Sequence, residues 1–202
     1  MSNLLDKIEL YFAENFMEEA IINDDLEVIK YFISLGIKLP EDAMDLAIKH
    51  EHLKMAKYFH SIGEEYTYTP SFMHLASKNG DLELVKHLHE KDVCIANAMD
   101  YAAFYGHLEV LKYLYEEVGA EFTTDAMDWA AENGQLEALE YLHSIGAKCT
   151  EDAVKMAYKN GELEILKFLY SINVKFPAEI MNKIDKYDLQ FEIIKFLKSI
   201  KK

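Results

Sequence analysis

The feature that most constrains this chain is a segment that recurs along it every 26 to 29 residues. The copies align without gaps and read DDLEVIKYF, EHLKMAKYF, GDLELVKHL, GHLEVLKYL, GQLEALEYL and GELEILKFL, starting at residues 24, 51, 80, 106, 134 and 161. A weaker copy, FEIIKFL, starts at Phe191. A steady period of this length is typical of a solenoid, in which each unit is too small to bury its own apolar face and stacks on its neighbours.

Each copy predicts a short amphipathic helix that ends in a tight turn. In the copy that starts at residue 106, Leu108, Leu111 and Leu114 recur at helical spacing, and Glu109 and Lys112 face outward. The residue after each helix is expected in the left-handed conformation, which glycine adopts freely and asparagine and aspartate tolerate. The six residues at this position are Gly36, Gly63, Asp92, Gly119, Gly146 and Asn173.

A second helix is predicted ahead of each copy. Its N-cap is expected at a column of side chains that accept a hydrogen bond from a free backbone N–H: Asn15, Asp42, Ser71, Asn97, Asp125 and Asp152. Three residues later, acids that suit the helix dipole and a capping box stand at Glu18, Asp45, Asp100 and Asp128. An alanine column, Ala20, Ala47, Ala76, Ala102, Ala130 and Ala157, is expected to let neighbouring helices approach closely. Trp129 shares its column with Leu46, Leu75, Tyr101 and Met156, which predicts packing between repeats.

These residues resemble the ankyrin repeat, whose signature T-P-L-H-x-A is followed by a glycine and a leucine-rich second helix. The copy nearest to it is Ser71-Phe72-Met73-His74-Leu75-Ala76 with Gly80-Asp81-Leu82. In detail the units are similar to the shorter ankyrin repeats of giant viruses and some amoebae. The resemblance covers residues 5 to 198 and implies an all-α, ankyrin-like helical repeat solenoid that serves as a protein-binding scaffold.

The repeat is shorter than the family standard of about 33 residues. The missing residues fall between the glycine stop and the next N-cap, where only five residues separate Gly146 from Asp152. We therefore expect the projecting β-hairpin fingers to be shortened or absent. The exception is a longer linker before Ser71, which carries Tyr66 and Tyr68.

The repeats account for nearly all of the chain and predict one repeat domain over residues 1–202. Residues 3–14 are expected to form an N-terminal capping helix, and residues 176–202 a degenerate C-terminal capping repeat. The six repeats between them start near residues 15, 42, 71, 97, 125 and 152.

The charge of the chain excludes several classes of partner. The net charge is −15, and all 21 basic residues are lysine. Phosphate backbones and anionic lipids attract basic patches, so we expect neither nucleic acid nor membrane as a partner. The first residues carry acids among apolar side chains, which is not a secretory signal, and no stretch is long and apolar enough for a membrane span. An intracellular, cytoplasmic protein is expected, in the host-cell cytoplasm if the source is viral.

The spacing of the histidine, aspartate and cysteine residues indicates neither a metal site nor a catalytic site. His50 and His52 are two residues apart on one helix and point in different directions, and His89 and His143 lie two repeats apart. We interpret these histidines as structural and expect no metal and no cofactor. The aspartate column is interpreted as helix capping, which leaves no reason to expect an enzyme. Cys94 and Cys149 lie in linkers two units apart and are expected to be reduced.

A recognition surface is predicted at the two residues before the mid-repeat glycine, a position that often contacts partners in ankyrin proteins. The candidate partner-binding residues are Lys78, Asn79, Phe104, Tyr105, Glu132 and Asn133, together with Tyr66 and Tyr68 of the longer linker. Two neighbouring aromatic residues are typical of interface hot spots, so Phe104 and Tyr105 lead this set. We expect a monomer whose concave helical face binds a protein or peptide, favouring a partner with a basic patch. The alternative is a structural protein that self-assembles.

Overall fold

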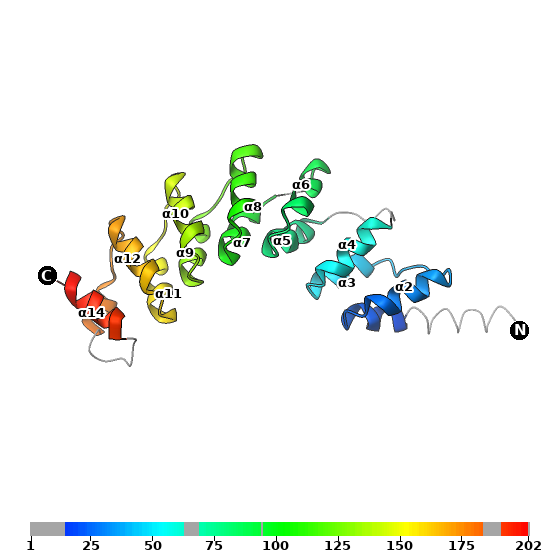
Figure 1. Ribbon diagram of the computed structural model, residues 1–202, viewed down its shortest axis with the longest axis horizontal. Helices are drawn as coiled ribbons and strands as arrows, with labels where there is room; N and C mark the ends of the chain where they lie inside the picture. The colour runs from blue at the N-terminus through cyan, green and yellow to red at the C-terminus, as the bar shows by residue number, and fades with distance from the viewer. Residues whose placement is uncertain (1–14, 63–68, 94, 184–190, 202) are drawn as a thin grey trace, which may run out of the picture. The chain divides into compact units, whose positions relative to one another are not determined.

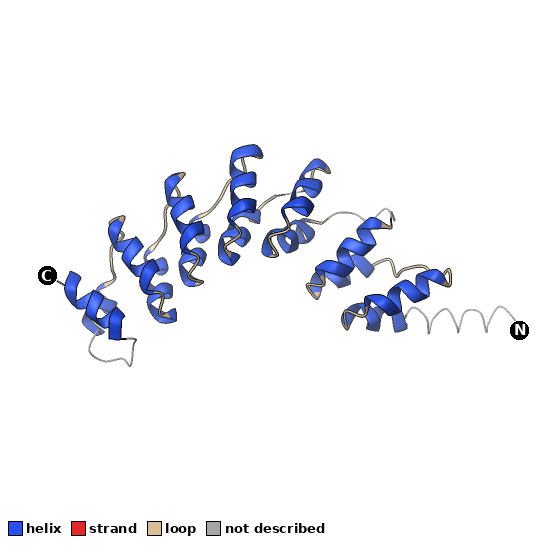
Figure 2. Cartoon of the chain, in the orientation of Figure 1, coloured by secondary structure: helices blue, strands red, loops and turns tan. Residues whose placement is uncertain are grey.

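The described part of the chain consists of helices and connecting loops. The computed structural model describes residues 15–62, 69–93, 95–183 and 191–201, and no strand occurs among them (Figure 2). The fold is the expected all-α repeat solenoid, in which the fingers between units are absent from these ranges. None of the helices in these ranges has the length and apolar content needed to cross a membrane.

The helices alternate between the first and the second of each repeat. Residues 15–22 are helical and precede α2 (Leu26–Ser34). The first helices that follow are α3 (Ala43–Lys49), α5 (Pro70–Lys78), α7 (Ala98–Tyr105), α9 (Thr124–Glu132), α11 (Glu151–Asn160) and α13 (Ala178–Lys183). The second helices are α4 (Leu53–Ser61), α6 (Leu82–Glu90), α8 (Leu108–Lys112) continued by η1 (Tyr113–Glu117), α10 (Leu136–Ser144), α12 (Leu163–Ser171) and α14 (Phe191–Ile200).

Contacts within the chain group the residues into two compact units, residues 1–75 and 76–202. Within the second unit, α7, α9 and α11 form one row and α8, α10 and α12 form the other (Figure 1). The capping helix expected at residues 3–14 lies outside the described residues. The assignment of residues 1–202 to one domain, with its repeat boundaries and capping segments, stays a prediction.

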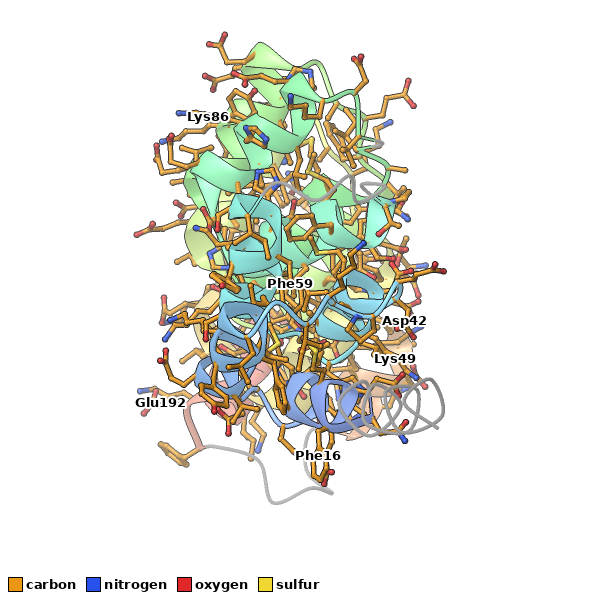
Figure 3. The ribbon with its side chains drawn as sticks, turned by 90° about the vertical axis from the view of Figure 1, so that its right-hand side faces the viewer. Phe16, Asp42, Lys49, Phe59, Lys86 and Glu192 are labelled. Atoms are coloured by element: carbon orange, nitrogen blue, oxygen red, sulfur yellow. The ribbon has the colours of Figure 1, made fainter. Side chains whose placement is uncertain are left out.

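The alanine column explains why the first helices stack closely. Ala102, Ala130 and Ala157 are fully buried, and α9 packs against both α7 and α11. A small side chain here lets two backbones approach, as the sequence predicted. Larger side chains fill the space between the two rows; Figure 3 shows Phe59 buried between the helices of its unit and Phe16 pointing away from them.

The turns that end the second helices have the predicted backbone conformation. Gly36, Gly119 and Gly146 have φ between 71° and 88°, and Asp92 and Asn173 have φ of 56° and 63°. All five therefore occupy the left-handed region expected of a helix stop. Gly63, the sixth member of the column, lies outside the described residues.

The predicted N-cap column is only partly correct. Asp42 and Asn97 do precede α3 and α7, although neither side chain accepts a capping hydrogen bond. Asn15 lies inside the helix of residues 15–22, and Ser71 follows Pro70, which opens α5 as proline often does at a first helical position.

The caps of α9 and α11 are threonines rather than the predicted aspartates. Thr123 and Thr150 have extended backbone, and each hydroxyl accepts the backbone N–H two residues ahead at 3.0 Å, from Asp125 and Asp152 respectively. The two aspartates therefore lie one step inside the helix, in its first turn.

Two of the four acids interpreted as a capping box, Asp100 and Asp128, connect neighbouring repeats instead. Asp100 accepts the backbone N–H and the hydroxyl of Thr123 at 3.2 and 3.0 Å. Asp128 makes the same pair of bonds to Thr150 at 2.8 and 2.6 Å. Both carboxylates are nearly inaccessible, and burial raises the pKa of Asp100 and of Asp128. Each acid thus fixes the residue that caps the first helix of the next repeat.

The step of 28 residues between two of the copies has a local cause. Gly119 lies 11 residues after Leu108, whereas Gly146 lies 10 residues after Leu136. The additional residue is taken up by the π-helical turn η1, which widens the end of α8. The second helix therefore ends at the same point relative to the following loop as in the other repeats.

Candidate functional site

Four aromatic side chains from two neighbouring first helices gather on one face of the second unit. Tyr101, Phe104 and Tyr105 stand at positions i, i+3 and i+4 of α7 and so share one side of that helix. Trp129 occupies the position on α9 that matches Tyr101 on α7, and the close packing of the two helices brings it beside them.

The rings meet at steep angles rather than in a stack. Trp129 lies 6.0 Å from Phe104, with their planes at 87°, and 6.2 Å from Tyr101, at 59°. Phe104 and Tyr105 are 4.7 Å apart at 58°. The contact between Phe104 and Trp129 is edge-to-face, a geometry that is favourable between aromatic rings. The prediction that Trp129 packs between repeats is confirmed.

The rings do not fill the space between the two helices. They line an open hollow of about 130 Å³, whose walls are Tyr101, Phe104, Tyr105 and Trp129. Tyr105 is 37% exposed, and the other three side chains are partly accessible. Most apolar side chains of first helices are buried, so this is an apolar surface that solvent reaches.

Tyr105 is held from two sides. The ammonium of Lys78 lies 5.3 Å from its ring centroid, a cation–π contact. The imidazole of His107 is nearly parallel to the ring, with centroids 6.3 Å apart. His107 is itself fixed, because its Nε2 is 2.7 Å from the carbonyl oxygen of Lys78. The tyrosine ring that borders the hollow is therefore supported by the preceding repeat.

Polar residues follow the aromatic cluster along α9. The side-chain amide of Asn133 donates to the carbonyl of Trp129 at 3.0 Å, which ends the helix. The carbonyl of Glu132 accepts from the Asn160 side chain at 2.7 Å. The Glu132 side chain is half-buried, and Asn79, which directly follows α5, is exposed.

The structure groups some of the predicted partner-binding residues and separates others. Lys78 and Phe104 each contact Tyr105, which borders the hollow. Glu132 and Asn133 lie at the end of the neighbouring α9, on the same row of helices. Tyr66 and Tyr68 lie outside the described residues.

Sequence reasoning missed two walls of the hollow, Tyr101 and Trp129. It assigned both positions to packing because the equivalent residues Leu46, Leu75 and Met156 are aliphatic or thioether side chains. A signal was present, since only these two members of the column are aromatic and they occur in consecutive repeats next to Phe104.

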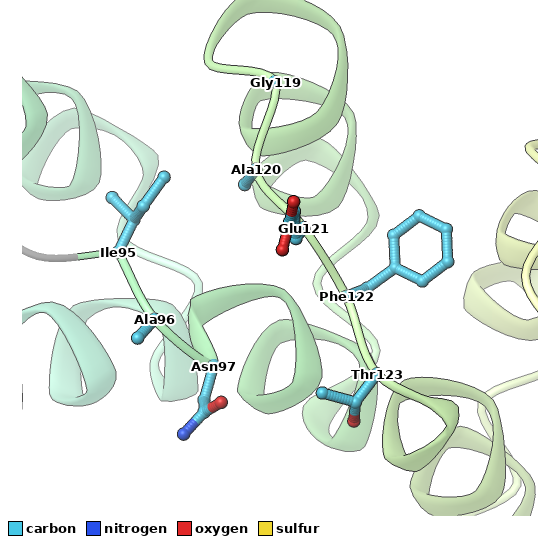
Figure 4. A pocket seen from close by; sticks show the side chains of 8 residues that line it. All are labelled: Ile95, Ala96, Asn97, Gly119, Ala120, Glu121, Phe122 and Thr123. Carbon is cyan, nitrogen blue, oxygen red and sulfur yellow. The ribbon is translucent and has the colours of Figure 1, made fainter.

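A second hollow lies at the loop edge, where a finger would project in a longer repeat. It has a volume of about 390 Å³ and lies between the linkers before α7 and α9 (Figure 4). Its walls are Ile95, Ala96, Asn97, Gly119, Ala120, Glu121, Phe122 and Thr123. Asn97 has a φ of 60°, and Phe122 contacts Tyr115 with ring centroids 6.1 Å apart.

The remaining reactive groups have structural surroundings. The Nδ1 of His89 is 2.9 Å from the Tyr113 hydroxyl, and His143 packs on Phe168. The expectation that His50 and His52 share a helix and point apart is wrong. They lie in the turn between α3 and α4, and their rings are nearly parallel, with centroids 5.9 Å apart. Burial raises the pKa of the Cys149 thiol, which disfavours the thiolate. No group of three or more His, Cys, Asp or Glu side chains in the described ranges could hold a metal ion. Cys94 lies outside these ranges.

The family of the chain follows from its repeats. A family model of ankyrin repeats (3 copies) matches residues 44–126 and 73–153, more than half of the chain. The chain belongs to the ankyrin-repeat family. Ankyrin repeats are generally protein–protein interaction modules, and ankyrin-repeat proteins are typically scaffolds without enzymatic activity. A search of curated proteins returned no match for this ankyrin-repeat chain.

Proposed function

We propose that this ankyrin-repeat chain is a scaffold that binds a protein or peptide on the face of its first helices, centred on the hollow between α7 and α9. The observation that carries the proposal is the set of four aromatic side chains around a solvent-accessible apolar hollow. Aromatic residues dominate the binding energy of protein interfaces when a partner excludes water from them.

The contrast with the equivalent positions supports a role beyond packing. Leu75 fills the Tyr101 position one repeat earlier and is 4% exposed, so an aliphatic side chain suffices for stacking there. The aromatic pair Phe104 and Tyr105 replaces Lys78 and Asn79 of the preceding repeat. Four large rings on two consecutive repeats exceed what the scaffold needs to hold its helices together.

The test compares partner capture by the whole chain and two variants. Phe104→Ala combined with Tyr105→Ala removes two walls of the hollow. The control Tyr31→Ala removes a 62% exposed tyrosine from α2, a second helix. Proteins recovered from the native cell by the wild type are identified by mass spectrometry, and their affinity is measured with purified components.

We expect the double variant to lose at least about tenfold in affinity, because each buried aromatic anchor contributes more than 1 kcal/mol. The control should bind normally, and circular dichroism should show native helicity in both. Unchanged binding by a folded double variant would remove the hollow as the binding site.

Self-assembly is the second candidate, favoured by two exposed phenylalanine side chains outside the hollow. Phe16 is 57% and Phe191 is 74% exposed. Sedimentation over a concentration series separates the candidates. A single monomeric species at every concentration argues against assembly, whereas a larger species that Phe191→Ser abolishes supports it.

The proposal includes a non-enzymatic role inside the cell. Asp100 and Asp128 are buried and engaged by threonines, so they are placed to hold repeats rather than to transfer protons. A cytoplasmic location is checked by fluorescence microscopy of a tagged chain in its native cell. Exclusive secretion of the tagged chain would contradict this part of the proposal.

A further inference from the structure

We infer that the hollow between α7 and α9 selects a peptide segment in which one apolar side chain is flanked by lysine or arginine. This inference rests on the proposed function and names the chemical class of the partner. It is carried by three observations: the size and apolar walls of the hollow, the position of Lys78, and the carboxylates on either side of Trp129.

The hollow fits a single side chain. Its volume is about 130 Å³ and its four walls are aromatic rings. An apolar cavity of about 150 Å³ holds one benzene ring, so a leucine, isoleucine, methionine or phenylalanine side chain matches this space. Complete burial of such a side chain contributes about 1.5 to 3 kcal/mol.

The position of Lys78 argues against a cationic side chain inside the hollow. Aromatic rings can bind ammonium groups, but the ammonium of Lys78 already lies 5.3 Å from the Tyr105 ring. A second cation beside Tyr105 would be repelled by it. The anchor of the partner is therefore apolar, and any cation of the partner must lie elsewhere.

Two carboxylates on α9 provide a place for a cationic side chain of the partner. Asp125 stands four residues before Trp129 and Glu132 three residues after it, so both share a side of the helix with the indole. Asp125 is exposed and Glu132 is half-buried. Lys155 on the neighbouring α11 is already paired with Asp152 at 2.7 Å. With a net charge of −15, the chain as a whole also favours a basic partner.

The spacing of these groups predicts the sequence of the partner. At a rise of about 1.5 Å per residue, Asp125 lies about 6 Å and Glu132 about 4.5 Å from Trp129 along the axis of α9. An extended peptide advances about 3.3 Å per residue. A peptide lying along α9 would thus place its basic residues one or two positions from the anchor, on both sides.

The experiment is a selection from a random peptide display library on the full-length chain. The peptide most enriched is then synthesised, and its binding is measured by fluorescence anisotropy and by the emission of Trp129. The signal is specific to the hollow because Trp129 is the only tryptophan in the sequence. The anchor is replaced by alanine in a second peptide, and the basic residues by glutamine in a third.

Three protein variants complete the design. Phe104→Ala with Tyr105→Ala opens the hollow, and Asp125→Asn with Glu132→Gln removes the flanking charges. Glu137→Gln with Glu140→Gln removes the same charge from exposed positions of α10, a second helix, and is the matched control.

We expect the selected peptides to share an apolar anchor with lysine or arginine one or two positions away. Replacing the anchor should weaken binding about tenfold or more, since it removes a buried apolar side chain. The Asp125 and Glu132 variant should bind about two- to fivefold more weakly, as expected for charges that solvent reaches, with a reduced dependence on salt. The control pair should bind like the wild type.

The outcomes separate the two levels of the proposal. Peptides that bind equally well to the Phe104 and Tyr105 variant, or a library that yields no binder, overturn both the hollow as the site and the partner class. Peptides that need Phe104 and Tyr105 but carry acidic flanks, or a cation as the anchor, overturn the partner class alone. An equal loss in the α10 control would show that only net charge matters and would also overturn it.

Discussion

Asp128 on α9 holds Thr150 by two hydrogen bonds, one to its backbone N–H at 2.8 Å and one to its hydroxyl at 2.6 Å. Thr150 in turn caps α11 by accepting the backbone N–H of Asp152 at 3.0 Å. One buried carboxylate thus determines where the next repeat begins its first helix. Asp100 and Thr123 repeat the arrangement one unit earlier.

Replacing Asp128 by alanine should destabilise the protein by about 2 to 3 kcal/mol, because two hydrogen bonds to a charged acceptor are lost and the Thr150 N–H loses its partner. Asp128→Asn keeps one carbonyl oxygen as an acceptor and should cost less. Urea denaturation followed by circular dichroism measures both, with Glu140→Gln on the exposed face of α10 as the control. Equal stability of Asp128→Ala and the control would refute the role of this bond.

The raised pKa of Asp100 and of Asp128 predicts that these two groups favour the folded state more at acidic pH than at neutral pH. A folded-state pKa above the ordinary aspartate value of 3.8 means that the folded protein binds the proton more tightly than the unfolded chain. Their contribution should therefore rise as the pH falls through the folded pKa towards 3.8, and fall as the pH rises.

The pH dependence that Asp100 and Asp128 contribute can be separated from the contribution of the other carboxylates. The free energy of unfolding is measured by urea titration at several pH values between about 4 and 7, for the wild type and for Asp100→Asn with Asp128→Asn. The double variant should show a smaller gain, or a larger loss, on acidification. Parallel pH profiles for the two proteins would contradict the assignment.

Gly106 and Gly119 should respond differently to the same substitution. Both have a positive φ, 76° and 71°, so alanine at either position is strained by about 1 to 2 kcal/mol. A Cβ at Gly106 would also meet the side-chain amide of Gln135, whereas a Cβ at Gly119 has open space.

We therefore expect Gly106→Ala to be the more destabilising of the two. Adding Gln135→Ala should remove most of this difference in stability, since it removes the side chain that the new Cβ meets, and a double-mutant cycle measures this coupling. A coupling energy of zero would mean that Gln135 moves aside without cost.

Tyr141 should make the fold sensitive to strong base. Burial, together with its hydrogen bond to Glu116 at 3.0 Å, raises the pKa of Tyr141 to about 12 from 10.0. Because the folded pKa is the higher one, the stability it contributes is present below pH 10.0 and is lost as the pH rises towards about 12. Urea titrations of the wild type and of Tyr141→Phe over this range should converge as the pH rises. Curves that stay a constant distance apart would contradict this.

The repeat framework could be predicted because its causes are local. The left-handed turns at Gly119 and Gly146 follow from residue type, and the buried Ala130 follows from its place in a column. The caps could not be placed in the same way. Thr123 and Asp125 are both good capping residues two positions apart, and the contact that decides between them comes from Asp100, 23 residues earlier in the chain.

Only half of the candidate site could be predicted from the sequence. Phe104 and Tyr105 stood out as adjacent aromatic residues at a position expected to face solvent. Tyr101 and Trp129 occupy a packing column, and whether such a residue is covered depends on the sizes of the side chains around it. The hollow exists because four rings meet at steep angles and leave space, a result of packing that no single position in the sequence encodes.

The π-helical turn Tyr113–Glu117 allows one repeat to be a residue longer without a change in the loop that follows it. An inserted residue is usually accommodated in a loop, where it alters the contour that a partner meets. Here the addition stays within a helix end, and the spacing from Gly119 to Asp125 equals that from Gly146 to Asp152. Repeats of unequal length can therefore be exchanged if the chain is cut at the glycines that follow the second helices. A graft made at these boundaries should transfer the α7–α9 hollow intact into another repeat array.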